Sequence, residues 1–546
     1  MHPLIAQILT KRGLTDPAQI EAFLHAGLDR LEDPFRMKGM DEAVRRVRLA
    51  VENREKILLH GDYDIDGICG TAILAKALTM LGGTFETFLP DRAEDGYGVS
   101  PAAVEKAKSS GVTLFITIDC GITAADEIRS ARDAGMDVLV IDHHRIAEGH
   151  LPPASVILNP LQSDCPYPHK DYCAAGLVFR FSQALLGERA LESLDLAALA
   201  TVGDVAPLVE ENRILVKEGL KLLSERKNTG LRALAEAAKL KSREMNAGHL
   251  GFVLGPRINA AGRMSSPDIA LRLLLTDNPK EAESLARVLD EENKARRKEE
   301  KDVLDQAVQE VERTVQFNRD RVIVVGREGW HAGVIGIVAS RLVERYNRPA
   351  LVIAVEKGRG KGSGRSIKGF HLFQALEACR ESLEEYGGHE LAAGFALSEP
   401  RIGEFRKAIN EYARERTTPD LFVKRTRVDL EIGFADLNLP FVRELQALEP
   451  HGCGNPKPVF LTRDLLIKTR PQPLGTSAFK FFVTDGVATL EAVLNDRGQD
   501  RSWMTMGNRV GLCYSIKIQT WDGLDRLVLE IKSSYLEDSL AGAISL

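Results

Sequence analysis

The sequence has few cysteines and no long hydrophobic run. Its seven cysteines are scattered over 546 residues without the spacing of a disulfide framework, so we expect a reducing, cytoplasmic environment. The longest apolar runs, such as residues 138–141, have the length of a β-strand and are too short for a membrane-spanning helix. Residues 1–12 lack a basic lead-in and a small-residue cleavage site, so we expect no signal peptide there.

The chain also lacks an excess of positive charge. Its net charge of -6 by itself favours an enzyme of small molecules over a protein that binds nucleic acid. Net charge averages over the whole chain, however, and an acidic metal site can coexist with a local basic groove. Composition therefore leaves the class of substrate open.

The hydrophobic pattern predicts an α/β fold with several domains, because 546 residues are too many for one core. From residue 43 to 205, strand-like runs alternate with helix-like segments, which is typical of a doubly wound parallel sheet. Charged residues dominate 279–314, which we interpret as a long, solvated helix that connects two domains. A second α/β region begins at residue 321.

After residue 421 the pattern changes to short strands separated by turns, which predicts a small β-barrel. Basic residues interleave there with Phe479, Phe481, Phe482 and Trp521, a combination that suits single-stranded nucleic acid, although these rings could equally form the barrel core. The expected domains are an N-terminal helical segment (1–42), a first α/β domain (43–275), a connecting helix (276–315), a second α/β domain (316–418) and the barrel (419–546).

Acidic residues follow three strand-like runs of the first domain and one helix-like stretch. The acidic and imidazole side chains at these positions are Asp62, Asp64, Asp66, Asp119, Asp142, His143, His144 and Asp204. Ligands of open parallel sheets bind beyond the carboxyl ends of the strands, so these side chains should converge there. Crowded carboxylates need cations, and a mixed oxygen and nitrogen set suits manganese, with magnesium possible. For any one aspartate alone, a helix cap or turn would be the simpler interpretation.

Segments 62–67 and 142–144 resemble the motifs that define the DHH phosphoesterase superfamily. This resemblance implies a two-metal site for Mn²⁺ or Mg²⁺, with Asp119 bridging the ions. The implied metal ligands are His60, Asp64, Asp66, Asp119, His143 and Asp204. The implied catalytic residues are Asp64, Asp66, Asp119, Asp142, His143, His144 and Asp204. Asp62 and His144 would lie behind the ligands or face the substrate.

Two segments rich in glycine and arginine could hold phosphate, because arginine matches phosphate oxygens and glycine lets backbone N–H groups approach. The first, 255–263, contains Arg257 and Arg263. The second, 357–366, contains Arg365 and Ser366; it lacks a P-loop pattern, and a mobile solvated loop is the simpler interpretation. Segments 363–366 and 387–394, the latter with His389, resemble motifs of the domain that accompanies DHH domains.

The resemblance extends to the RecJ family of exonucleases through the barrel region, where 451–458 resembles a RecJ turn, and through Arg92, which would touch a terminal phosphate. It implies 5′ to 3′ digestion of single-stranded DNA to mononucleotides by two-metal hydrolysis, with roles in recombination and repair. It also implies an OB-fold barrel, a monomer, and a single-strand-binding protein and a RecQ-type helicase as partners. No membrane partner is expected.

Three alternatives remain open from the sequence. One is a phosphodiesterase for very short RNAs or cyclic dinucleotides on the same core. Another is a non-catalytic strand-binding protein on an inactive core, which should have lost its carboxylates. The third is a zinc site at Cys165, His169 and Cys173, for which a fourth ligand and the usual spacing are missing.

Overall fold

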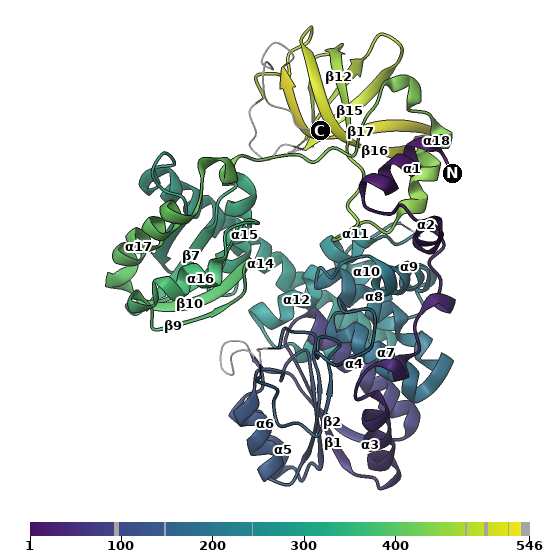
Figure 1. Cartoon of the computed structure of the whole chain (residues 1–546), viewed down its shortest axis with the longest axis vertical. Helices are drawn as coiled ribbons and strands as arrows, with labels where there is room; N and C mark the ends of the chain where they lie inside the picture. Colours follow the sequence, from purple (N-terminus) through teal and green to yellow (C-terminus); the bar gives the residue numbers. More distant parts are fainter. Residues whose placement is uncertain are drawn as a thin grey trace. The chain divides into compact units, whose positions relative to one another are not determined.

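A parallel sheet of five short strands forms the centre of the first domain (Figure 1). The strand order is β2-β1-β3-β4-β5, and the strands are β1 (Lys56–Gly61), β2 (Thr84–Phe88), β3 (Leu114–Ile118), β4 (Asp137–Ile141) and β5 (Val156–Leu158). This order reverses direction between β1 and β3, and such a switch point opens a crevice at the carboxyl ends of the strands. The computed structural model describes residues 1–91, 98–146, 149–242, 244–475, 478–495, 501–521 and 523–536, without the side chain of Trp521.

Helices cover both faces of this sheet, as the predicted doubly wound fold requires. One face carries α5 (Pro101–Ser109) and α6 (Ala125–Asp133), and the other carries α3 (Met40–Glu52), α4 (Ile65–Leu81) and α7 (Ala174–Leu186) (Figure 1). Helix α4 is apolar on nearly all sides because it is buried from Ile65 to Leu78. It ends at Gly82, whose φ of 76° lies in the left-handed region that favours glycine.

The remaining helices of the first domain extend the same core. They are α8 (Leu194–Gly203), α9 (Glu210–Glu225), α10 (Thr229–Ala237), α11 (Ala247–His249), the π-helical turn η4 (Leu250–Leu254), α12 (Gly255–Met264) and α13 (Asp268–Leu275). The predicted connecting helix is confirmed as α14 (Pro279–Thr314), which has 36 residues.

The chain divides into two compact units, residues 1–290 with 426–546, and residues 291–425. The second unit contains a mixed sheet in the order β6-β7-β8-β10-β9, formed by β6 (Ile323–Glu328), β7 (Ala350–Glu356), β8 (Arg359–Arg365), β9 (Glu385–Gly388) and β10 (Ala392–Ser398). Helix α15 (Ile335–Tyr346) and the end of α14 pack on one face, and α16 (Leu372–Ala378) and α17 (Ile402–Arg416) pack on the other.

The C-terminal strands form the predicted barrel, with the order β11-β12-β16-β17-β15-β14-β13 and an additional β12–β14 pairing. The strands are β11 (Leu430–Glu431), β12 (Phe460–Ile467), β13 (Gln472–Leu474), β14 (Ala478–Thr484), β15 (Thr489–Asn495), β16 (Arg509–Trp521) and β17 (Leu524–Leu536). Sequence patterns did not predict β13 or helix α18 (Leu439–Leu445). They also missed that α1 (Pro3–Lys11) packs Ile5, Ile8 and Leu9 into the barrel core, whereas α2 (Pro17–Leu24) contributes partly buried side chains.

A buried arginine joins the barrel to the first domain within one unit. Arg213 of α9 is 1% exposed and donates hydrogen bonds to the backbone oxygens of Ala447, Leu448, Glu449 and Pro450 at 2.7–3.3 Å. The next segment, 451–458, continues this joint, because the N–H of Leu208 donates to the oxygen of Cys453 at 2.7 Å. The turn that resembles RecJ is therefore a structural connection.

Candidate metal centre

The loop between β1 and α4 fixes the carboxylate of Asp64 by its own backbone. Asp64 caps α4, and its Oδ1 accepts from the N–H groups of Asp66 at 2.9 Å and Gly67 at 3.4 Å. A Cβ at Gly67 would lie 2.4 Å from the backbone of Asp62, so the turn requires glycine there. Asp64 is thus both the helix cap that a lone aspartate suggests and a member of the predicted cluster.

The Asp66 carboxylate is hydrogen-bonded to the N-terminus of helix α7. Its two oxygens accept from the N–H groups of Ala174 at 2.6 Å and Ala175 at 2.8 Å. These are free N–H groups of the first turn of α7, where the helix dipole also favours a negative charge. The carboxylate is therefore oriented by backbone donors that do not move independently of the fold.

The ends of β3 and β4 bring a third carboxylate and two imidazoles to the same place. Asp119 follows β3 with a φ of 63°, and its Oδ1 lies 3.2 Å from His143 Nε2 and 3.9 Å from His144 Nδ1. His143 Nε2 also lies 3.8 Å from Asp66 Oδ2. Residues from three strands, far apart in the sequence, therefore meet at the switch point of the sheet.

Three groups of side chains have potential ligand atoms within 4.8 Å of one another. They are Asp62 with Asp64 and Asp119, Asp119 with His143 and His144, and Asp66 with His143 and Asp204. Asp119 belongs to two of these groups, as does His143, so the three groups form one continuous site. Mixed carboxylate and imidazole donors of this kind suit Mn²⁺ and tolerate Mg²⁺.

The electrostatics of the cluster show why it fits cations. Burial and the charge of Asp66 raise the pKa of Asp204 from 3.8 to about 8. Burial and the same neighbouring charge also raise the pKa of Asp64 and of Asp119. Carboxylates packed out of water repel one another and retain protons unless a positive charge balances them. Divalent ions would provide that balance.

His144 is held by Asp142, which follows β4. Asp142 Oδ1 lies 2.7 Å from His144 Nδ1, and its Oδ2 accepts from the N–H of Ile122 at 3.0 Å. Although burial opposes both charges, this contact lowers the pKa of Asp142 and raises the pKa of His144. A carboxylate can only accept, so Nδ1 carries the hydrogen and His144 contacts other groups through Nε2.

His60 and Asp62 lie differently from what the family resemblance implies, which made His60 a metal ligand and placed Asp62 behind the ligands or facing the substrate. His60 is fully buried between the rings of Phe88 and Phe115, at 5.3 and 5.9 Å between centroids, with Nδ1 3.6 Å from Cys120 Sγ. Among the described residues, the three groups contain Asp62 and not His60. The role of His60 as a ligand stays a prediction. The sequence signal for Asp62 as a possible ligand was its alternate spacing with Asp64 and Asp66.

The first glycine-rich segment is a helix, α12, and the expectation of flexible backbone there is wrong. Asn259 Oδ1 accepts from the N–H of Ile65 at 2.8 Å, and a Cβ at Gly262 would lie 2.4 Å from the oxygen of Tyr63. Gly262 therefore permits close packing on the carboxylate loop. The charge of nearby Arg263 acts to lower the pKa of Asp64. Sequence patterns missed Asn259.

Arg257 points to a protein carboxylate. Its Nε and Nη2 lie 2.9 and 2.8 Å from Asp290 Oδ1, and its Nη1 donates to the oxygen of Val253 at 2.6 Å. Both side chains are mostly buried. The contact connects α12 to α14 within the first unit, and a substrate contact of Arg257 stays a prediction.

The second glycine-rich segment is strand β8, so a solvated loop is excluded. Its alternate glycines make room for large side chains: a Cβ at Gly362 would lie 2.2 Å from the ring of Phe395. Arg365 pairs with Ala392 in the sheet, and Arg365 Nη1 donates to Ser363 Oγ at 3.2 Å.

Ser366 and His389 lie at the same end of this strand pair. The N–H of Ser366 donates to the oxygen of Leu391 at 2.8 Å, and the N–H of His389 donates to that of Ala392. Gly388 has a φ of 136°, a conformation that side chains rarely adopt. The turn thus gathers Arg365, Ser366 and His389 in the second unit, and their substrate contacts stay predictions.

Comparisons with known proteins agree with this architecture. The DHH family N-terminal domain matches residues 56–203, the DHHA1 domain 319–415 and the RecJ OB domain 428–533. The single-stranded-DNA-specific exonuclease RecJ of Bacillus subtilis (strain 168) is 36% identical over 539 residues, which are 98% of this chain and 68% of that protein. The chain belongs to the RecJ family.

Two crystal structures of RecJ from Thermus thermophilus extend the match to three dimensions. The complex with Mn²⁺ has a TM-score of 0.84 at 31% identity and covers 100% of this chain and 77% of that one. The complex with Mg²⁺ has a TM-score of 0.78 at 30% identity, with 100% and 76% covered. The predicted fold class and the predicted metals are thus shown for the family.

The residues considered for a zinc site, Cys165, His169 and Cys173, do not form one. His169 Nδ1 lies 2.9 Å from Glu210 Oε2, and Cys173 caps α7 by accepting from the N–H of Gly176 at 3.4 Å. Across the described ranges, no group of potential metal ligands includes either of them or Cys165.

Two further expectations concern Arg92 and membranes. Arg92 lies outside the described residues. None of the described helices is long and apolar enough to cross a membrane.

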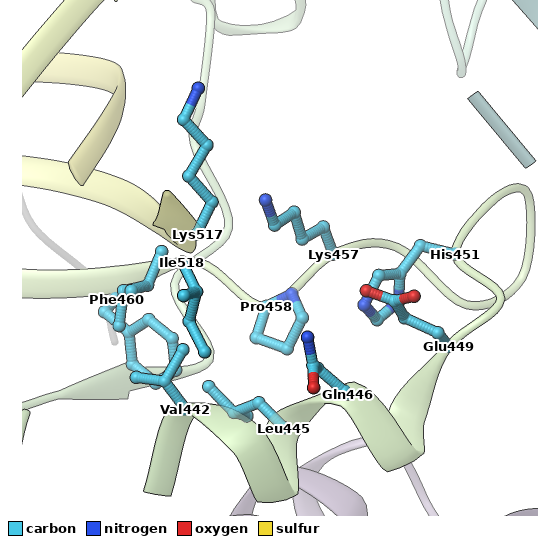
Figure 2. Close-up of a pocket in the computed structure, with 11 residues that line it drawn as sticks. Val442, Leu445, Gln446, Glu449, His451, Lys457, Pro458, Phe460, Lys517 and Ile518 are labelled. Carbon is cyan, nitrogen blue, oxygen red and sulfur yellow. The ribbon is translucent and has the colours of Figure 1, made fainter. Parts of the chain in front are cut away.

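The barrel divides its aromatic residues between core and surface. Phe481 is 1% exposed and belongs to the core, whereas Phe482 is 37% exposed. An open pocket lies on the barrel, lined by residues of α18, β12 and β16. In Figure 2, Val442 and Leu445 of α18 form its apolar floor, and Lys457 and Lys517 extend beside it. Both lysines pair with the single carboxylate of Glu530, at 2.9 and 3.2 Å, which offsets part of their charge.

Proposed function

We propose that this chain is an exonuclease specific for single-stranded DNA that hydrolyses phosphodiester bonds with two divalent ions, Mn²⁺ or Mg²⁺. The observation that carries the proposal is the sharing of Asp119 and His143 among three groups of potential ligands. Sharing of donors supports two cation positions side by side, which is the arrangement of two-metal phosphodiesterases. Full retention of the carboxylates argues against an inactive core.

The residues divide naturally between two ions. Asp62, Asp64 and Asp119 would hold one, and Asp66, His143 and Asp204 would hold the other. Asp119, whose Oδ1 lies 3.2 Å from His143 Nε2, would serve both ions, and His60 stays a further candidate from the family resemblance. Bound there, two ions would supply Lewis-acid stabilisation for the attacking and leaving oxygens of a phosphodiester.

The other residues of the site handle protons and charge. His144, whose pKa is raised by the contact with Asp142 although burial opposes it, could hold a proton at Nε2 for the leaving oxygen. Arg263, close to Asp64, can balance charge that develops on the phosphoryl group. In the second unit, Arg365, Ser366 and His389 would bind the strand, with Arg92 and Arg257 as further candidates from the sequence.

The remaining expectations are proposals that rest on the family. They are digestion from 5′ to 3′ with release of 5′-mononucleotides, action in DNA recombination and repair, a cytoplasmic monomer, and partnership with a single-strand-binding protein and a RecQ-type helicase. The exposed basic and aromatic side chains of the barrel, such as Phe482, support binding of single strands.

The test is digestion of matched oligonucleotides labelled at the 5′ or the 3′ end, single-stranded or duplex, with Mn²⁺, Mg²⁺ or a chelator. We expect labelled mononucleotide from 5′-labelled single strands at once, and progressively shorter fragments from 3′-labelled strands. Chelator should stop the reaction, and duplex should resist it. Cleavage of dinucleotides or very short RNAs alone, or undiminished cleavage in chelator, would contradict the proposal.

A further inference from the structure

A large aromatic side chain is exposed on the π-helical turn that precedes α12. Phe252 is 80% exposed, whereas Leu250 and Leu254 at the two ends of this turn are fully buried. Single exposed apolar residues are common and need no explanation. A π-turn is rare, however, and such turns occur frequently at functional sites. Here the turn directs its two leucines into the core and its phenylalanine outward.

The turn packs directly against the segment that carries Asp204. A Cβ at Gly251, next to Phe252, would lie 3.4 Å from Val202 Cγ1 in the last turn of α8. Asp204 caps α8 two residues later. Val205 follows with a φ of 63° and is 65% exposed. Two exposed apolar side chains therefore occupy adjoining segments beside a carboxylate of the metal centre.

The same turn is tied to the carboxylate loop. A Cβ at Gly255 would lie 3.3 Å from Ile65 Cδ1, and one at Gly203 would lie 2.8 Å from Ile65 Cγ2. Asn259, one helical turn after Gly255, binds the N–H of Ile65. The position of Phe252 is therefore fixed relative to the residue that follows Asp64.

We propose that Phe252, together with Val205 of the adjoining segment, is a stacking platform for a base of the single strand whose phosphates occupy the metal centre. This inference rests on the proposed function. A strand near this centre has its phosphates drawn to cations, and its bases need an apolar contact without hydrogen-bond specificity. An aromatic face meets that need for every base. Phe252 is thus a positioning residue that holds the strand without touching the reacting atoms.

The test combines substitutions with abasic oligonucleotides. Phe252→Ala should raise the KM for single-stranded DNA about tenfold, with kcat changed less than about twofold. Phe252→Tyr should retain the wild-type KM, and Phe252→Leu should have a KM between those of the wild type and Phe252→Ala. Phe35→Ala is the matched control, because Phe35 in η2 (Pro34–Arg36) is 43% exposed and should leave KM unchanged.

Abasic residues placed singly along the strand identify the contact. At one position the abasic residue should weaken the wild type as much as Phe252→Ala does, and it should have no further effect on that variant. Additive effects at every position, or an unchanged KM in Phe252→Ala, would overturn the platform. Strand affinities measured by fluorescence anisotropy in an Asp119→Asn background decide the same question without cleavage. Failure of the wild type to cut single strands would refute the nuclease function, whereas the affinities measured without cleavage test the platform.

Discussion

The two α/β domains place their polar side chains in opposite ways. The first gathers carboxylates and imidazoles at the carboxyl ends of parallel strands, where Asp66, Asp119 and Asp142 are at most 3% exposed. The second carries arginine, serine and histidine beside an edge strand, β9, that is exposed over its whole length. The first site is buried and charged, and the second is solvated.

This difference indicates a division of labour. Buried like charges are unstable by themselves, so the first domain is built for ions that neutralise them. Solvated donors such as His389 cost little to keep in place and can bind and release a phosphate chain. Chemistry should therefore depend on the metal centre of the first domain, and binding of the strand's phosphates away from the ions on the second. The predictions below test this division.

The largest effect is expected from Asp119→Asn. Asparagine tolerates the left-handed backbone at this position but removes the charge shared by two groups of ligands. Cleavage of single strands should fall at least about 1,000-fold, roughly 4 kcal/mol of transition-state stabilisation, while affinity for the strand changes less than about threefold.

The matched control is Asp137→Asn, at the opposite end of β4, where Asp137 pairs with Arg46 at 2.6 Å. Turnover in this variant should stay within about twofold of wild type, because surface ion pairs contribute little. Equal losses in the two variants would mean that the sheet edge is structural and not catalytic.

The next effect concerns pH and metal affinity. Burial and the charge of Asp66 raise the pKa of Asp204 from 3.8 to about 8. The metal-free folded chain therefore keeps a proton on Asp204 that the unfolded chain releases near pH 4. This contribution to stability is complete below about pH 4 and is lost as the pH rises through about 8. An incoming ion must displace that proton.

Calorimetry should therefore show Mn²⁺ binding that tightens with pH, by up to about tenfold per pH unit between pH 6 and 8. Asp204→Asn should bind more weakly at pH 8 and show a flatter dependence. Equal wild-type affinities at pH 6 and pH 8 would show that the carboxylates are already ionised in the metal-free protein.

A third prediction concerns Arg257, which the sequence assigned to substrate. Arg257→Gln removes the ion pair with the mostly buried Asp290, and should destabilise the fold by about 3 kcal/mol. Chemical denaturation measures this loss. Asp290→Asn should cost a similar amount, and the double variant should cost clearly less than the sum of the two.

Turnover decides the role of Arg257. If Arg257 acts only by connecting α12 to α14, Arg257→Gln and Asp290→Asn should impair cleavage to the same extent. Full stability in Arg257→Gln combined with a raised KM would assign it to the substrate instead.

The smallest effect is expected in the second domain. Arg365→Ala should raise the KM for 5′-phosphorylated strands about tenfold and leave kcat nearly unchanged, because the arginine would bind phosphate and not the reacting ions. Arg359→Ala is the control on the same strand, where Arg359 pairs with Glu384 and Glu385 at 3.0 and 2.8 Å. A fall in kcat without a change in KM would break the division between the domains.

The elements and the convergence of the carboxylates were predictable because they depend on short-range patterns. Buried strands such as β3 and β4 appear as apolar runs, and parallel strands bring whatever follows them to one edge. The family resemblance added the expectation of two ions in one site and the assignment of the barrel to the OB-fold.

The flexible backbone expected for the first glycine-rich segment, and the mobile loop considered for the second, were wrong because glycine has two uses. Gly262 and Gly362 are there for close packing, on Tyr63 and Phe395 respectively, and not for mobility. Only the partner across the contact distinguishes the two uses, and that partner is distant in sequence. The same reason hid the docking of α1 on the barrel and the pairing of Arg257 with Asp290.

The central claim is that the carboxyl edge of the first sheet holds two divalent ions side by side. The most direct measurement is an anomalous difference map from crystals soaked in Mn²⁺. The account predicts two peaks in each chain, one among Asp62, Asp64 and Asp119 and the other among Asp66, His143 and Asp204. No peak at this edge, or only one at saturating Mn²⁺, would contradict it.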